Sequence, residues 1–163
     1  MSDSDQILEI EKILESVTDP EIPVLTIADL GIIQNIEVDG DLVTTTITPT
    51  YSGCPAMDVI GDDIKYALEK VGFRSQIKLV LSPAWSTDMI SEEGKRKMEV
   101  YGIASPLKPH LDKRALLHGE KLVKCTRCGS TNTRMVSQFG STACKALFQC
   151  QDCQEPFDYF KCL

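Results

Sequence analysis

Four cysteines late in the chain have the spacing of a metal site. Cys125 and Cys128 form one C-x2-C pair, Cys150 and Cys153 form a second, and 21 residues (129–149) separate the pairs. Each C-x2-C turn offers two sulfur ligands, and two such turns complete the tetrahedral shell that Zn²⁺ takes in structural sites. The pairs therefore predict one metal bound by four thiolates. A structural zinc is favoured, with iron as the competitor, because both metals accept tetrahedral thiolate.

The other three of the seven cysteines are not explained by this spacing. Cys144 falls between the two pairs and Cys162 lies near the C-terminal end, and four ligands already fill the shell, so the roles of both thiols stay open. Cys54 stands alone in the first 120 residues. An odd number of cysteines cannot pair completely, so metal binding or thiol chemistry is favoured over a disulfide framework.

Cys54 is a second candidate site because it lies where a predicted strand ends and a predicted helix begins. Glycine precedes it and Pro55 follows it. A helix N-terminus lowers the pKa of a thiol, and thiolate is both the nucleophile and the metal ligand. The alternative is a small buried apolar residue at a corner of the fold. Cysteine protease chemistry is disfavoured, since it needs a histidine base and only His110 and His118 exist.

Three carboxylates precede the predicted strands and could gather near the Cys54 sulfur. They are Asp19, Glu21 and Asp29, as ligands or proton carriers, with the hydroxyl of Thr50 as a further neighbour. Acidic residues beside prolines and glycines also serve ordinary turns and helix caps, so this alternative stays open.

The pattern of apolar residues predicts an α+β layer, a small mixed sheet with helices packed on one face, followed by a small β-rich zinc ribbon. Asp39-Gly40 between two β-branched stretches predicts a hairpin. Prolines 20 and 23 predict an extended segment at 21–25. The predicted helices are 4–17, 55–72 and 86–100, and the predicted strands are 31–38, 42–49, 76–81, 135–139 and 146–149.

The composition predicts two domains joined by a linker. Gly102, Pro106, Pro109 and Gly119 give residues 102–120 the character of a connecting segment. The expected division is residues 1–105, a linker at 106–122, and a ribbon at 123–163 whose small core includes Phe157, Tyr159 and Phe160. A module near 40 residues needs its metal to fold.

Charge and hydropathy indicate which classes of binding partner are disfavoured. The net charge is −7, with +3 on residues 121–163 and −10 on residues 1–120. Nucleic-acid binding usually needs a basic face, so nucleic acid is disfavoured as the main partner. No stretch approaches the roughly 20 apolar residues that cross a bilayer, and the first residues are acidic where a signal peptide would be basic. We therefore expect a cytoplasmic protein without a membrane partner.

Several short motifs of residues 5–105 resemble the metal-sulfur cluster biosynthesis family. The resemblance implies that Cys54 takes part in iron–sulfur cluster assembly or transfer. The motifs are Asp19-Pro20-Glu21-Ile22-Pro23, Asp29-Leu30-Gly31, Thr50-Tyr51-Ser52-Gly53-Cys54-Pro55-Ala56, Pro83-Ala84-Trp85 and Ser91-Glu92-Glu93.

The ribbon and its segment Phe139-Gly140-Ser141-Thr142-Ala143-Cys144-Lys145-Ala146 resemble one branch of that family, found in bacterial phenylacetate catabolism. The branch implies a non-enzymatic accessory factor that assists maturation of the iron–sulfur or iron centres of the multicomponent phenylacetyl-CoA epoxidase, a monooxygenase. Its implied partners are the oxygenase or reductase subunits. One thiolate cannot enclose a cluster, so a transient cluster on Cys54 requires a homodimer or an external thiol. The alternative function is a non-catalytic scaffold that bridges subunits and holds only a structural metal.

Overall fold

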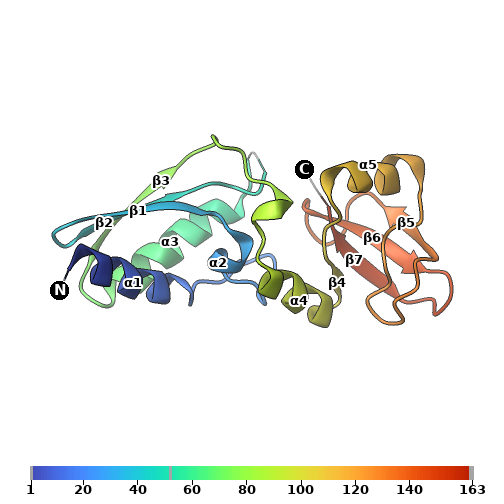
Figure 1. The fold of residues 1–163 in the computed structure, drawn as a ribbon, viewed down its shortest axis with the longest axis horizontal. Coiled ribbons are helices and arrows are strands. Elements are labelled where there is room, and N and C mark those ends of the chain that lie inside the picture. Colours follow the sequence, from blue (N-terminus) through green and yellow to red (C-terminus); the bar gives the residue numbers. More distant parts are fainter. Residues whose placement is uncertain (1, 52, 162–163) are drawn as a thin grey trace. The chain divides into compact units, whose positions relative to one another are not determined.

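The computed structural model describes residues 2–51 and 53–161 (Figure 1). The chain divides into two compact units, one ending at Trp85 and the next beginning at Ser86. Over these described ranges, no helix is both long and apolar enough to cross a membrane. The Cys162 thiol lies outside the described residues.

The first unit contains a three-stranded sheet in the order β1-β2-β3. Strands β1 (Ile33–Asp39) and β2 (Leu42–Ile47) are antiparallel and joined by a tight turn, in which Gly40 has φ of 63°. Strand β3 (Arg74–Leu79) runs parallel to β2, so the chain must cross over between them through a helix. The sheet is therefore mixed, and the predicted hairpin is confirmed.

Helices cover one face of this sheet (Figure 1). They are α1 (Asp3–Leu14), the single turn α2 (Ile27–Leu30) and the crossover helix α3 (Ala56–Glu69). The side chains of Val43, Thr45 and Ile47 alternate along β2 on the buried face, as the period of two of a strand requires. Ile60 and Ile64 of α3 are also fully buried, and each such side chain contributes about 1.5–3 kcal/mol of burial free energy. The predicted α+β class is confirmed.

The segment predicted to be extended at 21–25 is a turn instead. The Oδ1 atom of Asp19 accepts hydrogen bonds of 2.8 Å from the backbone N–H groups of both Glu21 and Ile22. The N–H of Leu25 then donates to the carbonyl of Ile22 at 2.9 Å. Proline fixes φ at a value that suits turns as well as strands, so the Asp19 carboxylate decides the local fold.

The second unit begins with a 3-10 turn, η1 (Thr87–Met89), and helix α4 (Glu92–Tyr101). It continues with β4 (Ile103–Ala104), helix α5 (Pro109–His118), and the strands β5 (Thr133–Ser137), β6 (Lys145–Cys150) and β7 (Pro156–Phe160). The sheet order is β4-β7-β6-β5, with β5, β6 and β7 antiparallel and β4 parallel to β7. The ribbon is therefore part of a larger unit than its cysteines alone suggest.

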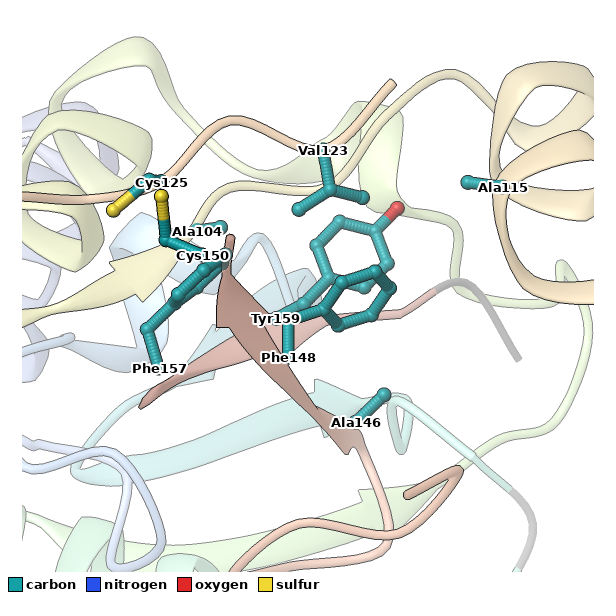
Figure 2. Packing of buried hydrophobic residues seen from close by; sticks show 9 residues of the cluster. All are labelled: Ala104, Ala115, Val123, Cys125, Ala146, Phe148, Cys150, Phe157 and Tyr159. Carbon is teal, nitrogen blue, oxygen red and sulfur yellow. The ribbon is translucent and has the colours of Figure 1, made fainter. Parts of the chain in front are cut away.

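The predicted linker at 106–122 needs correction, because most of it is α5 and belongs to this second unit. Ala115 is only 3% exposed and, in Figure 2, points toward Val123, Tyr159 and Phe148. Pro109 lies in the first turn of α5, and Gly119 ends the helix with φ of 66°. Proline and glycine at these two positions are the ordinary ends of a helix. The predicted domain boundary at 105 likewise differs from the observed division after Trp85.

Candidate metal centre and candidate thiol site

The two C-x2-C pairs bring their four sulfur atoms together in the second unit. The Sγ atoms of Cys125, Cys128, Cys150 and Cys153 all lie within 4.8 Å of one another. The distance is 3.7 Å between the Sγ atoms of Cys125 and Cys153, and 3.5 Å between those of Cys128 and Cys150. A tetrahedron with metal–sulfur bonds of about 2.3 Å has sulfur–sulfur edges of about 3.8 Å. The group fits one tetrahedral metal.

Backbone N–H groups of the two turns point at the sulfurs. Those of Arg127 and Cys128 donate to the Sγ of Cys125 at 3.3 and 3.5 Å, and that of Cys153 donates to the Sγ of Cys150 at 3.5 Å. This last N–H is the main cause that lowers the pKa of the Cys150 thiol to about 7, with help from the N–H of Asp152 and the neighbouring thiols, whereas contacts with the other cysteines raise the pKa of the Cys128 thiol. Metal ligands must be deprotonated thiolates, so these N–H groups favour the ligating form of the cysteines.

Hydrogen bonds tie the two turns to each other. The hydroxyl of Ser130 and the side-chain amide of Asn132 donate to the two carboxylate oxygens of Asp152, at 2.5 and 2.8 Å. The Arg127 guanidinium donates to Glu155 at 3.0 Å. The sequence does not indicate these contacts, because residues 20 to 28 positions apart give no local signal. They hold the four sulfurs in place from outside the shell.

A tetrahedral site of four thiolates suits both zinc and iron, and the sulfur–sulfur distances do not distinguish between the two metals. The negative charge of four thiolates is relieved chiefly by the backbone. The Arg127 guanidinium is already paired with Glu155, so the backbone N–H groups provide the direct contacts to sulfur.

Cys54 lies half-buried in the first unit, in the loop just before α3. Its backbone N–H donates to the carbonyl of Tyr51 at 3.2 Å, and its own carbonyl accepts from the N–H of Met57 at 3.3 Å. These two bonds fix the backbone on both sides of the thiol. The predicted position at a strand-to-helix corner is therefore observed, and the residue is partly exposed.

The pKa of the Cys54 thiol is raised from its ordinary value, which differs from the expectation. Burial is the main cause, and the carboxylates of Glu21 and Asp19 add to it by repelling a thiolate. The backbone N–H of Ala56 and the side chain of Tyr51 hydrogen-bond the sulfur and lower the pKa, as a helix N-terminus should, but they do not outweigh burial. At neutral pH this residue is mainly a neutral thiol.

Two of the four predicted neighbours act on Cys54. Asp19 is 8% exposed and Glu21 is half-buried, and both influence the thiol electrostatically. The carboxylate of Asp29 instead accepts a hydrogen bond of 3.0 Å from the N–H of Thr26 in the capping box of α2. Thr50 lies half-buried in the loop that follows β2. The Cys54 thiol is thus influenced by the side chain of Tyr51 and by two of the predicted carboxylates.

Cys144 is buried and lies apart from the four-sulfur group. Its Sγ is 3.0 Å from the hydroxyl oxygen of Thr142, and its carbonyl accepts from the N–H of Lys161 at 3.1 Å. Of the roles left open by the sequence, the structure makes Cys144 a buried thiol outside the four-sulfur group.

Comparison with known proteins agrees with a first part of the chain that contains Cys54 and a second part that contains the four-sulfur group. A family model described as the PaaD zinc beta ribbon domain matches residues 110–161, and one described as an iron–sulfur cluster assembly protein matches residues 8–79. A protein of Escherichia coli K12, provisionally named as a subunit of 1,2-phenylacetyl-CoA epoxidase, is 44% identical over 159 residues, covering 97% of this chain and 94% of that protein.

The chain belongs to the PaaD family. The branch expected from the sequence, whose members are also called PaaJ, is thereby confirmed. A match to the ribbon model that starts at residue 110 includes nearly all of α5, which agrees with the place of this helix in the second unit.

About half of the chain also matches shorter proteins. An "Fe-S protein maturation auxiliary factor" of Porphyromonas gingivalis is 44% identical over 88 residues, covering 52% of this chain and 83% of that protein. A crystal structure of a domain of unknown function, DUF59, from Bacillus anthracis matches with a TM-score of 0.53 and 27% identity, covering 57% of this chain and 91% of that chain. The name of the Porphyromonas gingivalis protein and the description of the family model at residues 8–79 both indicate an accessory role linked to iron–sulfur proteins.

Proposed function

We propose that this protein is a non-enzymatic maturation factor that carries an iron–sulfur cluster, or iron, on Cys54 and delivers it to the phenylacetyl-CoA epoxidase. The observation that carries the proposal is the half-buried Cys54 thiol, held in the loop just before α3 and within the electrostatic influence of Glu21 and Asp19. It lies within the residues that match the iron–sulfur cluster assembly family. The epoxidase as recipient is supported by the name of the Escherichia coli relative.

The raised pKa of Cys54 suits a carrier that must release its cargo. A thiol that is neutral at pH 7 has to lose a proton when it binds iron, so its affinity for metal is weakened by the cost of deprotonation. The carboxylates of Asp19 and Glu21 oppose the bare thiolate but favour a bound cation. Cargo would therefore bind when iron is present and leave for a site with more thiolate ligands.

One thiolate cannot hold a cluster alone, so the complete site needs a further ligand. We propose that the ligand comes from Cys54 of a second copy or from an external thiol. In the second unit, Cys125, Cys128, Cys150 and Cys153 would hold a structural metal, zinc in preference to iron, and this metal keeps the ribbon folded.

The test uses cells that express the epoxidase subunits together with wild type, Cys54→Ser or Cys144→Ala protein. The Cys144→Ala variant is the control, because it removes a buried thiol of the second unit that is not part of the four-sulfur group. Only Cys54→Ser should lower the iron content of the purified oxygenase or reductase subunit. If epoxidase subunits from Cys54→Ser cells carry full iron, Cys54 is not the carrier.

The second candidate function is a scaffold, favoured by the word "subunit" in the name of the same relative. A scaffold would remain bound to the epoxidase in equal amounts whether or not Cys54 is present. Copurification of wild type and Cys54→Ser protein with the complex, at equal iron content and equal activity, would support the scaffold and exclude the carrier.

A further inference from the structure

A turn in the loop before α3 brings Tyr51 next to Cys54. The N–H of Cys54 donates to the carbonyl of Tyr51 at 3.2 Å, and this bond closes a turn that begins at Tyr51 and ends at Cys54. The first and last Cα atoms of such a turn lie within about 7 Å of each other. The two side chains are therefore neighbours in space although they are three positions apart in the chain.

Gly53 sets the direction of the backbone in this turn. Its φ of 77° lies in the left-handed region, which glycine adopts without strain and other residues do not. A Cβ atom at this position would have no neighbouring heavy atom within 4 Å. Glycine is therefore needed for the path of the backbone and not for space, so Gly53→Ala would disturb the turn without touching either side chain.

Two donors reach the sulfur of Cys54. The side chain of Tyr51 hydrogen-bonds it from one end of the turn, and the backbone N–H of Ala56 does so from the start of α3. Tyr51 is half-buried, and the hydroxyl of a tyrosine that is withdrawn from water usually has a hydrogen-bond partner. With two donors on the sulfur, fewer directions remain open to an approaching cation.

The Tyr51 hydroxyl acts more strongly on a ligating sulfur than on a neutral one. Hydrogen bonds to an ionised acceptor are roughly twice as strong as those between neutral groups. The contact therefore strengthens when Cys54 loses its proton to water and its sulfur binds a cation. Hydrogen bonds to the ligand sulfurs are also among the factors that set the properties of iron–sulfur clusters. The hydroxyl thus favours the bound state of the sulfur.

We propose that Tyr51 is a positioning residue for Cys54, whose hydroxyl orients the sulfur and strengthens its bond to the iron cargo. This rests on the proposed function, because iron is the cargo named there. The donor at Ala56 belongs to the backbone and survives any substitution except proline, whereas the donor at Tyr51 depends on one side chain. Replacement of Tyr51 therefore weakens the binding of cargo while the thiol itself stays in place.

The first experiment measures the rate at which iodoacetamide alkylates Cys54 in the zinc-loaded full chain as a function of pH, by mass spectrometry. Tyr51→Phe keeps the ring and removes the hydroxyl, so the half-maximal pH should move upward. Gly53→Ala should also move it upward, because the strained turn holds the hydroxyl less closely. Tyr66→Phe is the matched control. Tyr66 is 69% exposed and lies about 15 Å along α3 from Ala56, so its profile should match that of wild type.

The second experiment titrates the same proteins anaerobically with ferrous iron alone, in competition with a chelator of known affinity. Tyr51→Phe should bind iron at Cys54 about tenfold more weakly than wild type, and Tyr66→Phe within about a factor of two. An alkylation profile of Tyr51→Phe that matches wild type overturns the proposal, because the hydroxyl then does not act on the sulfur. A shifted profile with iron affinity within about a factor of two of wild type overturns it as well.

The two experiments also separate this proposal from the carrier function. If wild type and Cys54→Ser protein bind ferrous iron equally, the carrier function fails. In that case an upward shift of the alkylation profile in Tyr51→Phe would still support Tyr51 as the residue that orients the thiol, and an unshifted profile would overturn it.

Discussion

Replacing Tyr159 with phenylalanine tests whether α5 is an integral part of the second unit. The Tyr159 hydroxyl donates to Oδ1 of Asp112 in α5 at 2.5 Å and accepts from the N–H of Leu107 at 3.1 Å. Tyr159 is fully buried and Asp112 is 3% exposed. Because phenylalanine keeps the ring and removes only the hydroxyl, the change deletes these two hydrogen bonds and little else.

The loss in the free energy of unfolding follows from the two groups that lose the Tyr159 hydroxyl as a hydrogen-bond partner, the Asp112 carboxylate and the Leu107 N–H. A buried donor or acceptor that loses its hydrogen bond costs about 1–3 kcal/mol, and a charged group lies at the upper end. Asp112 and Leu107 keep other interactions, so we expect a total loss of about 2–4 kcal/mol in the free energy of unfolding. For a domain of 60–100 residues, each kcal/mol lowers the unfolding midpoint by about 4–8 °C. The midpoint of the second unit should fall by about 10 °C or more.

Calorimetry of the zinc-loaded full chain measures this midpoint directly. Tyr101→Phe is the matched control, since Tyr101 lies in α4 with 59% of its surface exposed, and it should change the free energy of unfolding by less than about 0.5 kcal/mol. Asp112→Asn combined with Tyr159→Phe should cost less than the sum of the two single changes, because both remove the same contact. A midpoint within 2 °C of wild type for Tyr159→Phe would refute the place of α5 in this unit.

Three further predictions concern the thiols and the ribbon. Burial and nearby carboxylates raise the pKa of Cys54, so its rate of alkylation by iodoacetamide should reach half its maximum above the pH of about 8.5 that is typical of a free cysteine. Mass spectrometry measures this rate, and Asp19→Asn should move the half-maximal pH downward. A half-maximal pH that does not shift would contradict the electrostatic account. Cys125→Ser, or removal of the metal with a chelator, should abolish the near-ultraviolet circular dichroism of Phe and Tyr in the ribbon, while the first unit still unfolds cooperatively. A second unit that stays folded without metal would show that the ribbon does not need the metal. Gly140→Ala would place a Cβ atom 2.7 Å from Oδ1 of Asp158. The free energy of unfolding, measured by chemical denaturation, should fall by about 1–3 kcal/mol. An unchanged free energy of unfolding would mean that the Asp158 side chain moves aside without cost.

The sequence predicts most of what depends on local patterns. The spacing of Cys125, Cys128, Cys150 and Cys153 is sufficient to indicate one four-sulfur group, because each pair is closed by a single turn. The alternation along β2 and the Asp39-Gly40 turn give the hairpin for the same reason. The position of Cys54 before α3 also follows from its neighbours in the chain.

Long-range packing and burial account for the places where the structure differs from the prediction made from the sequence. The composition of residues 102–120 is equally that of a linker and of a short helix with proline at its start and glycine at its end. Only the contacts of Asp112 and Ala115 with distant residues distinguish the two. The pKa of Cys54 depends on burial and on Asp19 and Glu21, which lie more than 30 positions away in the chain. The sequence indicates both the helix N-terminus and the two carboxylates as neighbours of Cys54, but it does not show that burial outweighs the helix N-terminus.

The most direct test of Cys54 as a carrier is elemental analysis of anaerobically purified wild type, Cys54→Ser and Cys125→Ser protein. We predict iron that is lost only in Cys54→Ser, and zinc near one per chain that is lost only in Cys125→Ser. Iron at the same level in wild type and Cys54→Ser protein would contradict a cargo site at Cys54.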